Sequence, residues 1–240
     1  MSSHRWQGLW SGASPAGDVH KRAREVISPS GGIVRGKFPS RKNGRMVHHE
    51  GLLELDAIYL FETSPRIAIY REQPSTILYP DGERIRRYTP DFELTLISGE
   101  LVLIEVKPSR SMADDDVRHK LDCVNIYLQR SKEPLVILTE ICLRQEPRQT
   151  NVRMLYHRAP RMRPSLQACR LALENHRNKF PMAVNEAVTA LAPRGVDPYS
   201  LLLTGLLRCD LDTRVCGETQ LHLTEGSDDA WFCIAGGRDF

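Results

Sequence analysis

Two acidic residues and one lysine have the types and the spacing of a metal-dependent hydrolase. Asp91 follows Pro90 and precedes a strand-like run, and Glu105 stands fourteen residues further along the chain. Lys107 is two residues beyond Glu105, so in a strand the two side chains share one face. A tight turn at Ser98-Gly99 would join the two strands as a hairpin and bring Asp91 close to Glu105.

Carboxylates that converge in this way favour a divalent cation between them. Two nearby carboxylates repel each other unless a hard ion such as Mg²⁺ is shared, and that ion keeps positions open for water and a phosphate oxygen. The ion can lower the pKa of bound water, and Lys107 could position this water or offset transition-state charge. The pattern favours a Mg²⁺-dependent phosphodiester hydrolase, with Mn²⁺ as a substitute. The alternative is a plain turn followed by a solvated Glu/Lys pair.

A third carboxylate is expected from a helix upstream of these strands. Residues 48–62 carry apolar side chains at helical spacing, and Glu50 and Glu54 lie one turn apart on the same face. Like charges at this spacing are mildly destabilising, which indicates a use for at least one of them. The alternative is an ordinary solvated helix face.

The pattern around these motifs predicts an α/β domain in the order helix, three strands joined as hairpins, helix, strand. Residues 66–79 are predicted as extended chain broken near Gln73-Pro74, and residues 84–97 as a second strand region, with a turn at residues 79–82 between them. Residues 101–107 are predicted as a third strand, and a buried strand is expected at residues 134–138. The intervening helix is indicated by apolar residues at helical spacing, which are Val117, Leu121, Val124 and Leu128.

Four sequence blocks occur in the order of a known family. They are EGLLE (50–54), REQP (71–74), YTPDF (88–92) and LIEVKP (103–108). With LVILTE further on, they resemble the TnsA-like endonuclease subunit of heteromeric transposases over roughly residues 45–155. The resemblance implies a restriction-endonuclease-like fold with a PD-(D/E)xK core, and Mg²⁺-dependent cleavage of DNA at transposon ends.

The matching blocks also imply a role for each site residue. Glu54 takes the place of the helix carboxylate, Asp91 that of the central metal ligand and Glu105 that of the second ligand. The Val106 carbonyl would add another oxygen ligand, and Lys107 would be the catalytic lysine.

Two further residues are candidates for supporting roles. Glu50 replaces Glu54 if the register of the helix slips by one turn. Gln73 precedes a proline where the chain bends toward the site, so it is a candidate for contact with a ligand residue or with DNA. The alternative for Gln73 is a structural amide that bonds the backbone.

The resemblance further implies partners. In this family the subunit cuts the 5′ side of each transposon end, a separate DDE-type transposase cuts and joins the 3′ side, and an ATPase regulator contacts the pair. Double-stranded DNA, a DDE-type transposase and an ATPase regulator are therefore the expected partners. Two alternatives stay open: a non-catalytic DNA-binding or scaffold protein, and a stand-alone restriction or repair nuclease of the same fold.

Composition and charge fit a soluble DNA-binding protein. The chain has 240 residues, 41% of them hydrophobic, and no apolar run long enough to span a membrane. Its six cysteines form no C-x-x-C pair, so we expect reduced thiols in a cytoplasmic protein. The net charge is +3, but residues 1–49 hold nine Lys/Arg against two Asp/Glu. This predicts a flexible basic arm that contacts DNA phosphates, unless it is only a solvated face. Its candidate contacts are Arg35, Lys37, Arg41, Lys42 and Arg45.

The C-terminal third of the chain predicts a different unit. After a basic, proline-containing connector, three helices are followed by two short strands around Gly217, which is the element order of a winged helix-turn-helix. We therefore expect a basic arm at residues 1–45, a nuclease domain at residues 46–160 and a winged-helix-like domain at residues 161–240.

Overall fold

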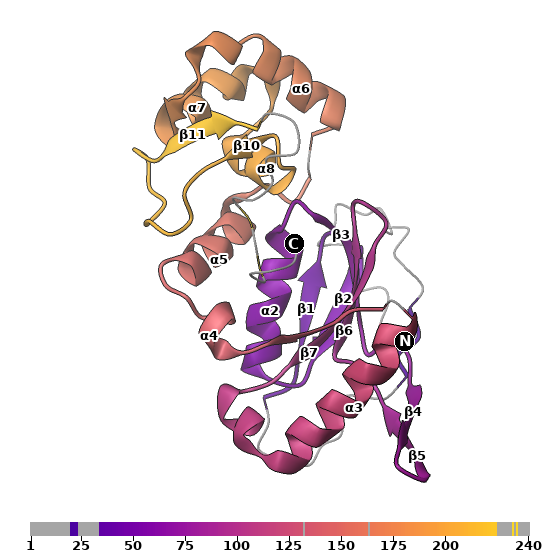
Figure 1. Ribbon diagram of the computed structural model, residues 1–240. Helices are drawn as coiled ribbons and strands as arrows, with labels where there is room; N and C mark the ends of the chain where they lie inside the picture. Colours follow the sequence, from indigo (N-terminus) through magenta and orange to yellow (C-terminus); the bar gives the residue numbers. More distant parts are fainter. Residues whose placement is uncertain are drawn as a thin grey trace. The chain divides into compact units, whose positions relative to one another are not determined.

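The chain folds as two compact units, each of which has its own core. In the computed structural model, the first unit is Met1–Ile58 with Ile67–Ile141, and the second is Tyr59–Arg66 with Cys142–Phe240 (Figure 1). The structure describes residues 20–23, 34–131, 133–162, 164–224, 232 and 234. Within these residues, no helix is long and apolar enough to cross a membrane.

The centre of the first unit is a four-stranded mixed sheet in the order β3-β6-β7-β8. Strands β3 (Ile67–Glu72), β6 (Phe92–Leu96) and β7 (Leu101–Val106) are antiparallel neighbours, and β8 (Leu135–Leu138) runs parallel to β7. Buried and half-exposed residues alternate along β6, as expected for a strand with one apolar face. Strand β7 is buried from Val102 onward, which suits a central strand covered on both faces.

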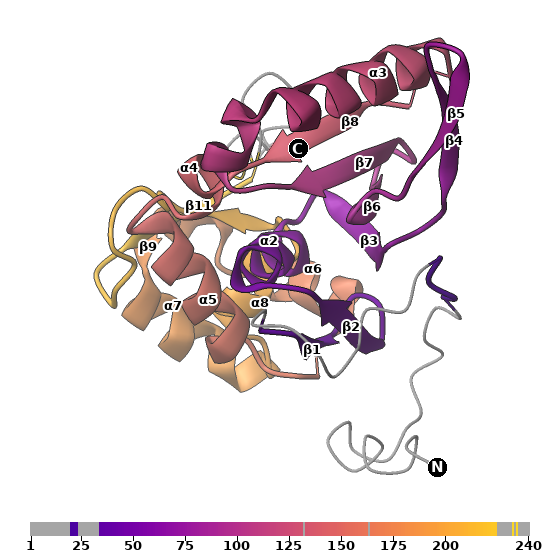
Figure 2. The ribbon, with the colours of Figure 1, turned by 90° about the horizontal axis from the view of Figure 1, so that it is seen from below.

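Two helices cover this sheet. Helix α3 (Asp115–Ser131) follows a short 3₁₀ turn, η2 (Ser109–Ala113), and its buried Leu121 and Val124 belong to one apolar cluster with Leu103 of β7. Helix α2 (Leu52–Thr63) lies on the opposite side of the sheet from α3 (Figure 2). The predicted order of helix, strands, helix, strand is therefore present.

A separate hairpin is inserted between β3 and β6. Strands β4 (Ile77–Asp81) and β5 (Arg84–Tyr88) pair with each other. The break predicted near Gln73-Pro74 separates β3 from β4, whereas the second predicted segment is two strands, β5 and β6, rather than one. Tyr79 and Tyr88 are buried in the same apolar cluster as α3, which holds the hairpin against that helix. The turn closes at Gly82, whose φ of 60° suits a residue without a Cβ.

The prediction of a flexible arm through residue 45 is wrong for its last residues. Strands β1 (Gly36–Ser40) and β2 (Arg45–His49) form a hairpin. The side chain of Asn43 in its turn donates to the Tyr70 carbonyl and accepts from the Tyr70 N–H, so the hairpin is bound to β3, the edge strand of the sheet. Residues 1–19 and 24–33 of the predicted arm lie outside the described residues.

The start of the first predicted helix also needs correction. His48 and His49 pair with β1, so they belong to β2, and the helix begins at Leu52 rather than at residue 48. Strand pairing takes precedence here over the helical spacing of the residues that follow.

The second unit combines short helices with a three-stranded sheet in the order β10-β11-β9. Its helix-sheet part runs helix, strand, helix, helix, strand, strand. Pro181 precedes β9, and the second of the three predicted helices begins after this strand, at Val184. The bounds are α4 (Glu140–Leu143, across the unit boundary), α5 (Arg148–Arg158), α6 (Leu166–Glu174), η3 (Arg177–Lys179), β9 (Met182–Ala183), α7 (Val184–Leu191), η4 (Ala192–Arg194), α8 (Pro198–Leu203), β10 (Leu207–Arg208) and β11 (Gln220–Leu223).

The boundary between the units lies near residue 141 rather than at the predicted residue 160. Helix α5 belongs to the second unit because the amide of Asn151 is buried there and fully bonded. This amide donates to the carbonyls of Leu211 and Thr213 and accepts from the Val215 N–H. The basic connector is therefore a structural helix of the C-terminal unit.

Candidate active site

The hairpin of β6 and β7 brings Asp91 to Glu105, as the sequence predicts. Phe92 pairs with Ile104, so Asp91 lies opposite the end of β7 that carries Glu105. The Val106 N–H donates to Asp91 Oδ2 over 2.8 Å, which fixes the carboxylate at this end of the sheet. Strand register alone therefore places the two acidic residues side by side.

Glu105 is buried, with 2% of its surface exposed, and both of its oxygens have partners. Oε1 lies 2.8 Å from Lys107 Nζ, and Oε2 accepts a 2.6 Å hydrogen bond from the Tyr88 hydroxyl. The Lys107 N–H donates to the Leu138 carbonyl, so β8 fixes the backbone that presents this lysine. The predicted Glu105/Lys107 pair is thus an ion pair rather than two solvated charges.

The first turn of α2 supplies Glu54 to the same cluster. Its Oε2 accepts a 2.7 Å bond from the Glu50 N–H, a contact that holds the carboxylate at the N-terminal end of the helix. The charge of Glu54 raises the pKa of Asp91, whereas the charge of Glu50 raises the pKa of Glu54. The structure therefore brings Glu54 to the cluster and leaves Glu50 as its neighbour.

Burial and mutual repulsion shift the acid–base properties of these groups. Burial raises the pKa of Asp91, and the charges of Glu105 and Glu54 raise it further. Burial also raises the pKa of Glu54, to about 7. Burial alone would lower the pKa of Lys107, but Glu105 and Asp91 outweigh it, so this pKa lies above its ordinary value and the side chain stays an ammonium.

The donor set fits a hard divalent cation. Three carboxylates, of which Glu105 is buried and Glu54 and Asp91 are half-buried, gather around one ammonium. Burial and mutual repulsion raise the pKa values of Asp91 and Glu54. Oxygen ligands around an excess of negative charge are what Mg²⁺ prefers.

The backbone of Gln73 contacts the site. Its N–H donates to the Asp91 carbonyl over 2.8 Å, and its own carbonyl accepts from the Ala23 N–H. Its φ of 45° is in the left-handed region, which is uncommon for a non-glycine residue. Such a conformation marks a strained link, here between β3 and the residue that would bind the metal.

Arg45, a predicted DNA contact, has a structural partner. Its guanidinium binds both oxygens of buried Glu72, over 2.9 and 2.7 Å, and Glu72 also accepts from the His48 N–H. This pair ties β2 to β3. Arg45 is therefore committed to the fold, and we remove it from the candidates for phosphate contact.

The other predicted DNA contacts lie on or beside the same hairpin. Lys37 is exposed on β1, and Arg35 immediately precedes that strand. Arg41 and Lys42 lie in the turn, where the Lys42 ammonium donates to the Ile67 carbonyl. The basic residues are thus presented by a paired structure instead of by free chain.

Tyr88 is the site residue that sequence reasoning misses. It opens the YTPDF block, three residues before Asp91, and its hydroxyl reaches Glu105 because β5 ends beside β7. Its position inside a block that contains Asp91 is the signal that could have identified it.

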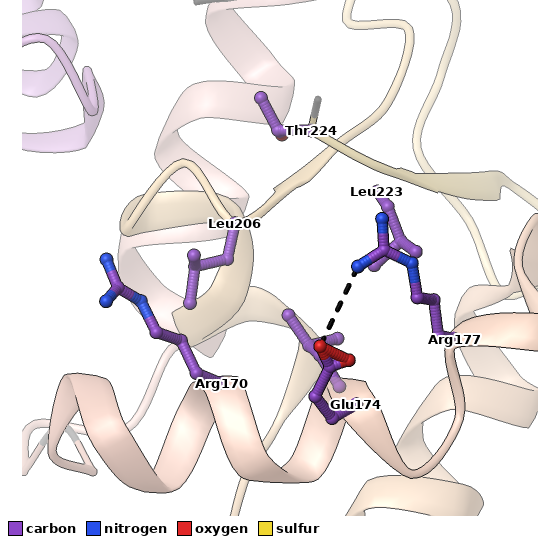
Figure 3. A pocket seen from close by; sticks show the side chains of 7 residues that line it. Arg170, Glu174, Arg177, Leu206, Leu223 and Thr224 are labelled. Atoms are coloured by element: carbon purple, nitrogen blue, oxygen red, sulfur yellow. Dashed lines mark ion pairs between the residues drawn. The ribbon is translucent and has the colours of Figure 1, made fainter. Parts of the chain in front are cut away.

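A pocket of about 530 Å³ lies within the second unit, whereas the residues of the carboxylate cluster belong to the first unit. Arg177 and Glu174 form an ion pair across its rim at 3.7 Å (Figure 3). None of the site residues predicted from the sequence lines this pocket. Its walls are Arg170, Leu173, Glu174, Arg177, Leu206, Leu223 and Thr224.

Comparison with known proteins identifies the first unit. Residues 64–140 match the family model of the TnsA-like endonuclease N-terminal domain. This part of the chain is similar to the N-terminal domain of a TnsA-like endonuclease. The TnsA-like match runs from the end of α2 through β8, so it includes Asp91, Glu105 and Lys107, while Glu54 precedes it. No curated protein matches the chain. The resemblance noted in the sequence is confirmed, and the TnsA-like domain suggests a nuclease.

Proposed function

We propose that the chain is a Mg²⁺-dependent DNA endonuclease subunit that cleaves the 5′ strands at transposon ends, together with a DDE-type transposase, in cut-and-paste transposition. One observation carries the proposal. Inside the TnsA-like domain, Asp91 is bonded to the strand end that carries Glu105, and Glu105 is paired with Lys107. This arrangement supports a PD-(D/E)xK core.

Glu54, Asp91, Glu105 and the Val106 carbonyl would hold the Mg²⁺ ion, and Mn²⁺ would substitute for it. When bound, the ion polarises the scissile phosphodiester and activates water. The protein's own groups prepare for this chemistry. The Val106 N–H and the Tyr88 hydroxyl orient the carboxylates, and the Lys107 ammonium offsets negative charge that develops on the phosphate.

The second unit supports contact with DNA or with a partner protein. Its order is helix, strand, helix, helix, strand, strand, and the first strand pairs with the last. This order supports the winged-helix-like domain that the sequence predicts for residues 161–240, and its helices and strands span residues 166–223. The partners proposed for the whole chain are double-stranded transposon ends, a DDE-type transposase and an ATPase regulator.

The test is strand-specific cleavage of a labelled transposon-end duplex, with Mg²⁺ and with a DDE-type transposase as the partner. We expect cuts on the 5′ side only when both proteins are present. In the Asp91→Ala variant cleavage should fall by at least about a hundredfold, because a metal ligand is lost. Binding of the duplex should be kept or strengthened, because a charge that repels phosphate is removed.

Glu100→Ala is the matched control, since Glu100 is an exposed acidic residue in the turn between the same two strands. It should cleave as the parent does. Equal cleavage by Asp91→Ala and the parent would refute the site. Efficient cutting of plain duplex by the chain alone would instead favour a stand-alone nuclease, and binding without any cutting a scaffold protein.

A further inference from the structure

A second group of ligating side chains lies where the tip of the β4–β5 hairpin meets α3. His119 Nε2 is 2.9 Å from Asp81 Oδ1 and 3.6 Å from Cys123 Sγ. The three donor atoms all lie within 4.8 Å of one another. An oxygen, an imidazole nitrogen and a thiol sulfur therefore converge on one small volume.

The local structure explains why these atoms meet. His119 and Cys123 are four residues apart on α3, so they stand one above the other on a single face. Asp81 is the last residue of β4 and shares a strand face with Tyr79, whose ring is buried against α3. The packing of the hairpin on the helix thus carries Asp81 to the pair of donors.

We propose that Asp81, His119 and Cys123 form a binding site for a borderline-soft divalent ion, Zn²⁺, which clips the tip of the β4–β5 hairpin to α3. Thiolate and imidazole select zinc over the hard ions, and a carboxylate is a common third ligand. A fourth, tetrahedral position remains for water, because His119 is 65% exposed.

The distances fit this ion. Zinc bonds of about 2.0–2.3 Å place tetrahedral donors about 3.3–3.8 Å apart, close to the separation of the His119 and Cys123 donors. Asp81 and His119, now hydrogen-bonded, would separate slightly as the ion replaces the shared proton. Binding forms bonds to sulfur, nitrogen and oxygen, releases the thiol proton of Cys123 to solvent and leaves the proton of the neutral His119 ring on Nδ1, so that Nε2 is free to bind the ion.

Arg86 prepares the carboxylate for this role. It pairs with Oδ2 of Asp81, which leaves Oδ1 directed toward His119. Partners of this kind orient metal-binding carboxylates in known sites. The same charge pair keeps the aspartate ionised, as a ligand must be.

The site of Asp81, His119 and Cys123 differs from the proposed magnesium site in its ligand atoms and in the role of the bound ion. Sulfur and nitrogen donors discriminate against Mg²⁺, whereas the cluster around Asp91 offers only oxygen. The clip would hold the far end of the hairpin whose near end carries Tyr88, the partner of Glu105. Zinc would therefore stabilise the support of the active site without entering it.

The test is a titration of the reduced, chelator-stripped full chain with Co²⁺, read by absorption spectroscopy. Cobalt substitutes for zinc and reports a bound thiolate through a charge-transfer band. We expect one equivalent of Co²⁺ to produce this band together with tetrahedral ligand-field bands, and Zn²⁺ to displace it. In Cys123→Ser the thiolate band should vanish, and in His119→Gln the affinity should fall by at least about tenfold.

Two variants serve as controls. Cys216→Ser removes another exposed thiol, and Asp91→Asn alters the proposed magnesium site. Both should keep the band at the parental affinity, so the result is independent of whether the chain is a nuclease. The absence of a thiolate band in the parent, or the same band in Cys123→Ser, would overturn the proposal.

Discussion

At the scale of single residues, Glu105 is held by two partners of different character. Lys107 supplies a charge and Tyr88 a neutral hydrogen bond. Burial and the charge of Glu105 raise the pKa of Tyr88, so its hydroxyl keeps its proton and remains a donor. The orientation of Glu105 is therefore set before any metal arrives, which is the purpose that outer hydrogen bonds serve in metal sites.

This arrangement predicts the effect of Tyr88→Phe. Without the hydroxyl, one buried oxygen of Glu105 loses its donor, and the carboxylate is free to turn away from the metal position. We expect the affinity for Mn²⁺, measured by calorimetry without DNA, to fall by about 10–100-fold. Tyr127→Phe, on the same packed cluster, is the control and should bind as the parent does. Equal affinities for Tyr88→Phe and the parent would remove Tyr88 from the site.

The acidic residues were predictable and the tyrosine was not, for a physical reason. Two-residue periodicity and a Ser98-Gly99 turn fix which residues of β6 and β7 meet, so Asp91 and Glu105 follow from the sequence. Tyr88 reaches Glu105 from a strand outside the sheet, and no spacing rule links β5 to β7.

At the scale of elements, hairpin β1–β2, which was not predicted, supports the predicted sheet. Hairpin β1–β2 carries a sequence signal, Asn43-Gly44, which is a preferred hairpin turn, and Gly44 has a φ of 61°. The basic composition around it outweighs this signal and suggests a free arm. Only the structure reveals that Asn43 bonds the edge strand β3 at Tyr70.

The hairpin predicts how DNA binding responds to salt. Arg35 and Lys37 stand at the start of β1, and each is proposed to neutralise one phosphate. Replacing both by alanine should weaken binding to any duplex and reduce the slope of log K against log salt by about 2. The slope is obtained by fluorescence anisotropy at several salt concentrations. Arg130→Ala, an exposed arginine on α3, is the control. A slope equal to that of the parent would assign the hairpin a purely structural role.

At the scale of the whole molecule, the carboxylate cluster links stability to pH and to metal. Burial raises the pKa of Glu54 to about 7 in the folded chain. As the pH rises, the Glu54 carboxyl therefore loses its proton at a lower pH in the unfolded chain than in the folded chain. The free energy of unfolding therefore falls as the pH rises from the ordinary value of about 4 to about 7, and stays low above it. Asp91 contributes in the same direction.

This linkage gives a measurable prediction. Between pH 5 and pH 8 the metal-free chain should lose up to about 3 kcal/mol through Glu54, and Glu54→Gln should flatten this dependence. The proposed Mg²⁺ ion would bind the ionised carboxylates, so stabilisation by Mg²⁺ should be larger at pH 8 than at pH 5. Chemical denaturation at both pH values, with and without Mg²⁺, provides the numbers. A parent and a Glu54→Gln variant with the same pH dependence would show that Glu54 is not buried in the cluster.

The division into units shows what a sequence pattern does not predict. The strands of the central sheet and the three helices of the second unit follow from the sequence pattern, but β9 and helix α5 do not, nor does the unit to which α5 belongs. That membership depends on the buried amide of Asn151 and its contacts with residues 211–215, which lie some sixty positions away. Contacts of such long range leave no periodic trace in a single sequence.

The central claim is that Asp91 and Glu105 share a divalent metal ion. Its most direct test is an anomalous difference map from crystals of the chain soaked in Mn²⁺. We predict a peak within bonding distance of the carboxylates of both residues, and its loss in crystals of Asp91→Ala. A map from saturating Mn²⁺ with no peak between these two residues would contradict the account.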